Sequence, residues 1–420
     1  MCKTVLFHCI ANTYSDIWTE NNLIICLSLQ LLVLHNFILH ENCPHVLLSD
    51  NNLMRAKTST EIKPSILDIL QYVINSEGTA LLGIKCDDLG SRLQLKFNNL
   101  RSLKTGNFIS GILLIATAQS VFVSIQHCVI RNNDNGATIR NLLKFIFDLV
   151  SSSNQCQGFD RTACRLLAPW FCTTLGSVLA SINIQQFHGI SPEALNWISL
   201  GLNTDVASSK LKLASIYFCI GDYHRTETAL RDIEGKYEQN IVQPVCNCHF
   251  SQQGYKNKRG FNEISDTHNE EALQHIAAFC VTFLTSEINC IPVELQYELF
   301  RSTQEDLALR GIFDIWMDCA VMDSLPYLYF LQHKTYSYLG RQEDKQRALS
   351  NLIRTIDQEP NLGHRETALN LLGQCMEQEG QPTDALRCYF LSLKLRQRNN
   401  VAKIHICRLL STLVNSQAQN

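Results

Sequence analysis

Residues 366–395 read ETALNLLGQCMEQEGQPTDALRCYFLSLKL, and this stretch decides the fold. Leu369, Leu372 and Met376 recur at the spacing of one helix face, which predicts an amphipathic helix. Gly380 follows that helix. Glycine is the commonest residue just past a helix C-terminus because it adopts positive φ without strain. The first half of the stretch is therefore expected to be a helix that ends at a glycine turn.

The second half of the stretch predicts another helix. Pro382 is suited to the first helical position, and Ala385 and Tyr389 share one face of the turns that follow. Gly373 and Ala385 are small, so two antiparallel helices could approach closely there. Such a hairpin cannot cover its own apolar face. It therefore predicts a stacked array of similar hairpins, and arrays of this kind typically bind other molecules.

Two more stretches repeat this pattern. Residues 213–223 read LASIYFCIGDY, with Leu, a small residue, Tyr and Gly at the spacing of a tetratricopeptide repeat, although Thr226 replaces the usual alanine. The stretch 336–360 gives another match, and the segment 402–413 has the pattern of a terminal capping helix. We therefore expect an all-α fold in which residues 206–420 form an α-solenoid of helix-turn-helix, tetratricopeptide-like pairs.

The composition indicates a globular chain. It has 420 residues, enough for two or three units or one elongated solenoid, and 45% of them are hydrophobic. A formal net charge of −3 leaves no basic excess, so nucleic acid is not expected as a partner. The one small basic cluster, Lys256, Lys258 and Arg259, is interpreted as part of a solvated loop.

The cysteine pattern favours a reducing compartment. The 18 cysteines are scattered through apolar helical runs, and we interpret them as small buried hydrophobes. The sequence has no Asn-x-Ser/Thr glycosylation site and does not open with a basic-then-apolar leader. We therefore expect a cytoplasmic protein.

Two apolar stretches, 23–39 and 108–125, could be interpreted as membrane spans. Each is barely long enough to cross a bilayer. Each also contains polar residues such as Gln30 or Gln119, which raise the free energy of insertion. We therefore expect buried core helices and no membrane span.

The N-terminal residues carry a second pattern. It consists of KTVLFHC at 3–9, Trp18, the apolar run that begins near 20, NCPH at 42–45 and NNL at 51–53. This arrangement resembles the end of the helical lobe of the Mab-twenty-one-like nucleotidyltransferases, the family that includes cyclic GMP-AMP synthase. The resemblance implies that residues 1–57 are a remnant of that lobe, followed by a helical region of unknown type at 58–205.

The same resemblance identifies what this sequence lacks. Residues 46–49 read VLLS where the family has Tyr-Phe-Ile-Pro. In the family, a Gly-Ser turn and spaced carboxylates that hold two metal ions precede the Lys-Thr pair, and no Gly-Ser here is followed by Asp-x-Asp or Glu-x-Asp. We therefore expect a pseudoenzyme with no catalytic residues and no cofactor. The remaining possibility is that Met1 is a misplaced start and that a longer product contains the missing half.

Two groups of potential metal ligands are interpreted as structural residues. The first consists of His35, His40, Cys43 and His45. Its spacing does not match the tight ligand pairs of structural zinc sites. The second consists of Cys246, Cys248 and His249. It is too cramped for four ligands without a distant partner, so we expect a surface loop there and no metal site.

The concave face of the array is the candidate binding site. In the repeat frame its exposed first-helix positions are Lys334, Tyr338, Asn370, Gln374, Glu377 and Gln378. These positions would line a groove for a protein or peptide partner, although polar helix faces are often simply solvated. The last repeat offers amides and a carboxylate where a peptide carboxylate would need cations, so a carboxylate clamp is not expected.

These observations lead to two hypotheses for function. The first is a non-catalytic helical-repeat interaction or adaptor protein derived from a nucleotidyltransferase family. The alternative is a regulatory or fragmentary member of the cyclic GMP-AMP synthase-like family, which senses nucleotides or nucleic acid in innate immunity. The sequence specifies neither the partner nor the oligomeric state.

Overall fold

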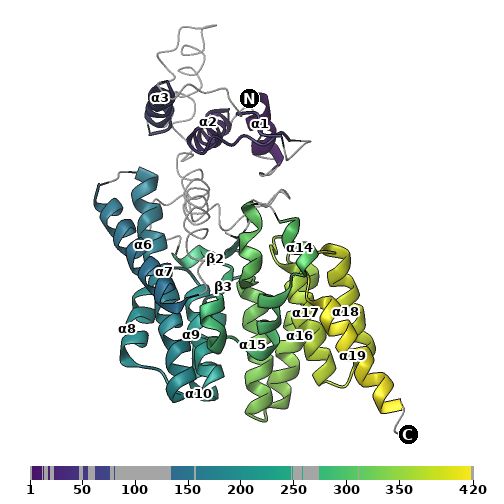
Figure 1. Ribbon diagram of the computed structural model, residues 1–420. Coiled ribbons are helices and arrows are strands. Elements are labelled where there is room, and N and C mark those ends of the chain that lie inside the picture. Colours follow the sequence, from purple (N-terminus) through teal and green to yellow (C-terminus); the bar gives the residue numbers. More distant parts are fainter. Residues whose placement is uncertain are drawn as a thin grey trace. The chain divides into compact units, whose positions relative to one another are not determined.

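The computed structural model of the protein is predominantly helical over the residues that it describes (Figure 1), as the sequence predicted. These residues are 2–11, 13, 18, 23–46, 51–54, 62–75, 80, 134–155, 158–246, 248, 258, 274–310 and 312–417. The chain divides into two compact units. The first is Met1–Ala116 with Ser251–Ala272, and the second is Thr117–Phe250 with Leu273–Asn420.

The first unit contains three described helices. They are α1 (Cys2–Ala11), α2 (Leu23–Leu39) and α3 (Lys63–Asn75). Its small core is built from α2, α3 and the loop between them, through the buried side chains of Ile38, Cys43, Met54 and Leu70.

The loop after α2 is closed by Asn52. Its Oδ1 accepts a hydrogen bond from the Cys43 N–H over 2.9 Å, and its Nδ2 donates to the backbone oxygen of Glu41 over 2.8 Å. Asn52 also forms an antiparallel bridge with Pro44, whose backbone oxygen lies 2.8 Å from His8 Nε2. Four residues of the N-terminal sequence pattern, His8, Cys43, Pro44 and Asn52, are therefore linked by contacts.

The first described helices of the second unit are α6 (Asn135–Gln155), α7 (Gly158–Phe187) and α8 (Pro192–Gly201). Helix α7 packs against both α6 and α8. It crosses α8 closely at Gly176, where an added Cβ would lie 2.7 Å from the backbone oxygen of Ala194 and 2.6 Å from the Ile198 side chain. Glycine is required at this crossing because the opposing backbone cannot move aside.

Three helical hairpins occupy the stretches with the repeat pattern. They are α9 (Ser208–Cys219) with α10 (Tyr223–Lys236), α15 (Ser324–Tyr338) with α16 (Gln342–Gln358), and α17 (Arg365–Gln378) with α18 (Pro382–Leu395). The first helix of each ends at a glycine with positive φ: Gly221 at 81°, Gly340 at 69° and Gly380 at 72°. In each turn the next residue donates its N–H to a carbonyl five positions earlier, as Gln381 does to Met376 over 2.8 Å. The predicted helix-turn-helix pairs are confirmed.

The described residues between α10 and α15 form a series of short elements. These elements are β1 (Gln243–Val245), β2 (Ala277–Phe279), β3 (Val281–Phe283), η5 (Thr285–Cys290), α13 (Val293–Gln296), η6 (Tyr297–Phe300), α14 (Gln304–Ala308), η7 (Ile312–Asp318) and β4 (Ala320–Met322). Strand β1 pairs in parallel with β2, and β3 pairs antiparallel with β4. The sequence did not predict these short strands. We call the described residues of the second unit in this stretch, 243–246, 248, 274–310 and 312–322, the inserted segment.

The core of the second unit is centred on α15. Almost every residue of this helix is buried, from Ser324 to Tyr336. The core also includes Phe283 from the inserted segment and Tyr389 from α18. The capping helix expected at 402–413 is present as α19 (Ala402–Gln417), which packs against α18.

One described helical stretch, Leu167–Phe187 of α7, is long and apolar enough to cross a bilayer, and most of it is buried within the second unit. The stretch 23–39 is helical as expected and forms α2, whose part Cys26–Leu39 is a shorter apolar helix. The expected burial is only partial, because Cys26, Leu29, Leu32 and Ile38 are buried and most other described side chains of α2 are half-buried. The stretch 108–125 lies outside the described residues.

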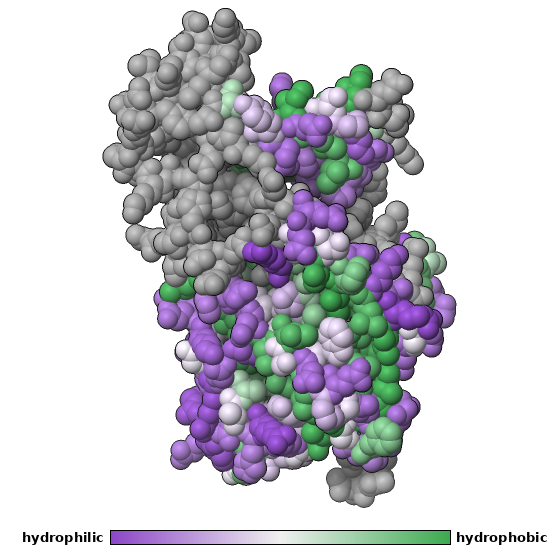
Figure 2. Space-filling view, turned by 90° about the vertical axis from the view of Figure 1, so that its left-hand side faces the viewer, coloured by the Kyte–Doolittle hydropathy of each residue, from purple (hydrophilic) through white to green (hydrophobic). Residues whose placement is uncertain are grey.

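The second unit also has apolar side chains on its surface. Figure 2 views the side that carries α6 and α8, where apolar side chains gather among polar ones. Leu143, Phe147 and Val150 of α6 are exposed. These residues recur at helical spacing, so α6 has an apolar stripe on its outer side in addition to the one that it buries.

Candidate functional site

The polar side of α17 carries most of the candidate residues. Asn370, Gln374 and Gln378 are four residues apart and lie on the same side of the helix. Gln378 is exposed, but Asn370 and Gln374 keep only 1% and 4% of their surface exposed. The expectation of exposure is therefore wrong for these two residues. The reason is that α13 and η6 of the inserted segment pack against this side of α17.

Hydrogen bonds fix this packing. Asn370 Nδ2 donates to Glu298 Oε1 over 2.9 Å and to Asn400 Oδ1 over 3.1 Å. Gln374 Nε2 donates to the backbone oxygen of Glu294 over 3.0 Å. The inner part of the predicted groove is thus filled by another segment of the same chain, and the amides that were expected to recognise a partner bind that segment.

The two candidate residues on α15 differ in their surroundings. Lys334 is buried and pairs with the Glu294 carboxylate of α13, so its expected exposure is also wrong. Tyr338 keeps 59% of its surface exposed, and its ring stacks on Tyr223 with the centroids 4.5 Å apart. Tyr338 therefore belongs to a surface beside the α9–α10 hairpin and does not line the same pocket as the residues of α17.

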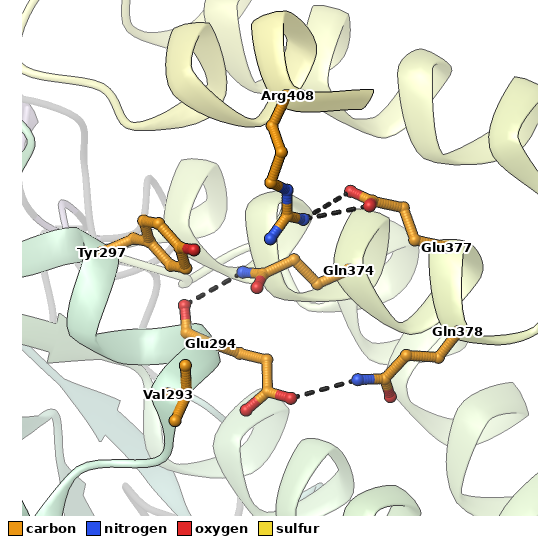
Figure 3. A pocket seen from close by; sticks show the side chains of 7 residues that line it. All are labelled: Val293, Glu294, Tyr297, Gln374, Glu377, Gln378 and Arg408. Carbon is orange, nitrogen blue, oxygen red and sulfur yellow. Dashed lines mark hydrogen bonds and ion pairs between the residues drawn. The ribbon is translucent and has the colours of Figure 1, made fainter. Parts of the chain in front are cut away.

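A pocket of about 320 Å³ lies beside α17 (Figure 3). It is lined by Val293, Glu294, Tyr297, Gln374, Glu377, Gln378 and Arg408. The three lining residues on α17 were predicted from the sequence. The others come from α13, η6 and α19, and no local spacing in the sequence connects them with α17.

The charged groups of the pocket are paired with one another. Arg408 Nη2 donates to both carboxylate oxygens of Glu377 over 3.0 Å, and the guanidinium lies 5.6 Å from the ring centroid of Tyr297. Burial would lower the pKa of Arg408, but the Glu377 carboxylate raises this pKa above its ordinary value. Gln378 Nε2 donates to Glu294 Oε1 over 3.1 Å. The lining therefore presents two carboxylates, one guanidinium, two amides and an aromatic ring.

His405 of α19 lies between the rings of Tyr297 and Tyr389, with centroid distances of 4.9 and 5.1 Å. Its Nε2 is 3.3 Å from the side-chain nitrogen of Gln374. Burial, reinforced by the positive charge of Arg408, lowers the pKa of His405 from 6.5 to about 4. The imidazole is therefore neutral at neutral pH. The sequence did not single out this residue, because one histidine on a terminal helix carries no spacing signal.

The second group of potential metal ligands is not on the surface. Cys246 and Cys248 follow β1 and are buried in the second unit, so the expectation of a surface loop is wrong for both. His249 lies outside the described residues, as do Lys256 and Arg259 of the basic cluster.

The first group of potential ligands belongs to the first unit. Cys43 is buried in the core of that unit, and His40 Nδ1 lies 2.9 Å from the backbone oxygen of Asn36. Among the residues that the structure describes, the side chains of this group do not bring three ligand atoms together.

Comparison of the chain with models of protein families, with curated proteins and with solved structures finds no match. Its function is therefore inferred from its residues and their geometry.

Proposed function

We propose that the protein is a non-catalytic interaction protein, an α-solenoid of tetratricopeptide-like hairpins that binds a short peptide segment of a partner protein. The observation that carries this proposal is the pocket of Figure 3. Its lining comes from two helices of the array, α17 and α19, and from the segment that packs on them.

The packing of the helices supports a solenoid. Along the chain, α15 packs on α16, α16 on α17, α17 on α18, and α18 on α19. The same glycine turn closes each of the three hairpins. In a repeat array, each helical pair covers the apolar face of its neighbour in this way.

The charges of the pocket favour a basic side chain of the partner. Glu294 and Glu377 provide two carboxylates against the single guanidinium of Arg408, and Tyr297 offers a ring face to a cation. A lysine or arginine of the partner would replace Arg408 as the positively charged group paired with the Glu377 carboxylate. Both carboxylates have partners: Glu294 pairs with the buried Lys334, and Glu377 pairs with Arg408 and accepts from the Tyr389 hydroxyl. The Arg408 side chain is 41% exposed, so its pair with Glu377 is the one that a basic ligand can exchange.

The size of the pocket and the inserted segment limit the length of the motif. A volume of about 320 Å³ is at the lower end of the range for ligand pockets and accommodates one or two side chains. Asn370, Gln374 and Lys334 are already bound to the inserted segment. An extended peptide along the inner face of α17 would meet that segment. The partner is therefore expected to present a short, exposed basic motif.

Peptide binding to the full chain tests this proposal. Fluorescent peptides in which one position is basic, acidic or neutral are titrated with the protein, and their anisotropy is measured. Basic peptides are expected to bind. Glu377→Gln should weaken this binding about tenfold, because a hydrogen bond to a charged group contributes about 1.5 kcal/mol.

A second variant tests whether the pocket prefers basic or acidic peptides. Arg408 competes with a basic ligand for Glu377, so Arg408→Gln should leave the affinity for basic peptides unchanged or increase it. Arg398→Gln is the matched control, since Arg398 is exposed but does not line the pocket. Selective binding of acidic peptides, or equal binding by all variants, would contradict the proposal.

The cysteines support a cytoplasmic location, which is part of this proposal. Those that the structure describes are free thiols, and most of them are buried. Free thiols in such number fit a reducing compartment, where disulfides are rare.

A second candidate function is nucleotide or nucleic-acid sensing by a regulatory or fragmentary relative of cyclic GMP-AMP synthase. It is favoured by the N-terminal pattern, of which Cys43 and Pro44 contact Asn52. The full chain can be incubated with nucleoside triphosphates, Mg²⁺ and double-stranded DNA, and the products separated by chromatography. A cyclic dinucleotide would support this candidate, and the absence of any product would favour the interaction protein.

A further inference from the structure

Three cysteines and one histidine meet inside the second unit. They are Cys246, Cys248, Cys280 and His364, and all four are buried. Their potential ligand atoms, three Sγ atoms and one imidazole nitrogen, lie within 4.8 Å of one another. Within the described part of the chain, no other set of three or more potential metal ligands converges in this way.

Strand pairing and a helix start bring these residues together. Cys246 follows β1 and Cys280 follows β2. Because these strands are parallel, their carboxyl ends lie at the same edge, and the Cys280 N–H donates to the Val245 oxygen over 2.9 Å. Cys248 lies two residues beyond Cys246. His364 directly precedes α17 and comes 118 residues after Cys246.

The distances fit a shared metal ion better than a disulfide. Cys248 Sγ lies 3.5 Å from Cys280 Sγ, and Cys246 Sγ lies 3.2 Å from His364 Nε2. The sulfurs of a disulfide are about 2.05 Å apart. Two thiolates on one tetrahedral zinc ion, each at about 2.3 Å, are about 3.8 Å apart. The cluster therefore needs only small side-chain shifts to surround an ion.

The donor set selects zinc among the common metals. Thiolates and imidazole suit Zn²⁺, whereas Mg²⁺ and Ca²⁺ require oxygen ligands. Four protein ligands complete a tetrahedral sphere and leave no open position for a substrate, which is the arrangement of a structural site. We infer that Cys246, Cys248, Cys280 and His364 together bind one structural zinc ion.

Other buried cysteines of this chain are used differently. Cys375 and Cys388 pack among apolar side chains of the main core, where a thiol acts as a small hydrophobe. In the cluster, by contrast, the sulfur atoms face one another and an imidazole. This difference makes Cys388 a suitable control for tests of the cluster.

The backbone around the cluster is fixed by groups that are not ligands. The Asp323 carboxylate accepts hydrogen bonds from two successive N–H groups, including that of His364 over 2.8 Å. The Trp316 ring meets the imidazole edge-on with the centroids 4.9 Å apart. On the strand side, Asp205 Oδ2 accepts from the Phe279 N–H over 2.7 Å. Such outer contacts hold metal ligands in position in known sites.

A zinc ion at this position would join the inserted segment to α17. His364 lies at the start of the helix that carries Gln374 and Glu377 of the pocket. Because the unfolded chain lacks a formed site, the free energy of metal binding adds to the free energy of folding. The inference does not depend on what the pocket binds.

Metal analysis of the full chain tests the inference. The protein is produced without a polyhistidine tag in zinc-containing medium, and its metal content is measured by mass spectrometry after gel filtration. One zinc ion per chain is expected. After exchange into Co²⁺, the protein should show the thiolate-to-cobalt charge-transfer band and the intense visible bands of tetrahedral cobalt.

Variants assign the metal to the cluster. Cys248→Ser and His364→Asn should each lower the zinc content and alter the cobalt spectrum, whereas Cys388→Ser should retain one zinc ion. If the ligand variants do not fold, the zinc content and cobalt spectrum of the unmodified chain still decide the question. An unmodified chain without stoichiometric zinc, or one with a Cys248–Cys280 disulfide, would overturn the inference.

Discussion

The three glycine-turn hairpins and the inserted segment differ in how the sequence encodes them. Each hairpin is specified by residues close in sequence, through helical spacing and a glycine with positive φ. The inserted segment is held by buried polar contacts between distant residues, such as Lys212 and Glu287, which are 75 positions apart. The hairpins supply a regular scaffold, while the inserted segment supplies Glu294 and Tyr297 of the pocket.

The largest effect on stability is expected from Glu287→Ala, which removes the buried ion pair between the inserted segment and Lys212 of α9. Lys212 Nζ lies 2.8 Å from Glu287 Oε1, and both side chains are almost fully buried. Loss of the carboxylate leaves a buried, unpaired ammonium group. The free energy of unfolding should fall by about 3–5 kcal/mol, measured by urea denaturation.

A second pair provides the control. Lys210 forms a partly exposed ion pair with Asp232 at a similar distance, 2.7 Å. Lys210→Ala should lower the free energy of unfolding by about 1 kcal/mol or less. Equal losses for Glu287→Ala and Lys210→Ala would show that the buried Lys212–Glu287 pair contributes no more to stability than the partly exposed Lys210–Asp232 pair.

The next effect concerns the hairpin scaffold. A Cβ added at Gly373 would lie 2.4 Å from the ring of Tyr389, so the α17–α18 crossing has no space for a side chain. Gly373→Leu should lower the free energy of unfolding by about 3 kcal/mol, the upper end for overpacking a core, with a corresponding fall in the melting temperature.

Gly235 of α10 is the matched control for this substitution. A Cβ added there meets no atom within 4 Å in the described structure. Gly235→Ala should be neutral or stabilise the protein by up to about 1 kcal/mol, through helix propensity. If Gly373→Leu were equally harmless, the close helix crossing would not exist in solution.

The smallest effect is a pH dependence at the contact between the scaffold and the inserted segment. The pKa of His405 is about 4 in the folded chain, against 6.5 for an ordinary histidine, which is the value that applies in the unfolded chain. The unfolded state therefore binds a proton as the pH falls below 6.5, whereas the folded state does not. The stabilisation is complete above pH 6.5 and is lost progressively toward pH 4, by about 2 kcal/mol between pH 7 and 5.

His405→Gln removes this titration while keeping a polar side chain beside Gln374. Urea denaturation of both proteins at pH 7 and pH 5 should show that the unmodified chain loses about 2 kcal/mol more than the variant. The groups beside His405 are Arg408, Tyr297 and Tyr389, and they are the same in both proteins. Glu377, which pairs with Arg408 and Tyr389, is also unchanged. Identical losses would mean that folding does not lower the pKa of His405.

Helical periodicity was enough to predict the scaffold. The spacing of Leu369, Leu372 and Met376, with Gly380 after them, depends only on local geometry, and the helix and its glycine turn are present. The helical expectation is wrong for the stretch 277–283, which the predicted all-α array of residues 206–420 included. Its two strands are three residues each and exist only because β1 and β4 pair with them.

The candidate site was predicted only in part, for a related reason. Side-chain type placed Gln374, Glu377 and Gln378 on one polar side of α17, and they do line the pocket. Side-chain type could not show that Asn370 and Lys334 are buried, because polar residues are covered only when a distant segment supplies partners. The same limit applies to Cys246 and Cys248. Their spacing could not show that Cys280 and His364, which are distant in the sequence, lie beside them in the fold.

The inserted segment covers the side of α17 that carries Asn370 and Gln374, so any other ligand would have to compete with that segment. The inserted segment is tethered to the array at both ends, so its effective concentration at that face is on the order of millimolar or higher. A free peptide in a cell is usually far more dilute and would have to outcompete a ligand that never diffuses away. In the described structure, a free ligand would therefore reach only the part of α17 that the inserted segment does not cover.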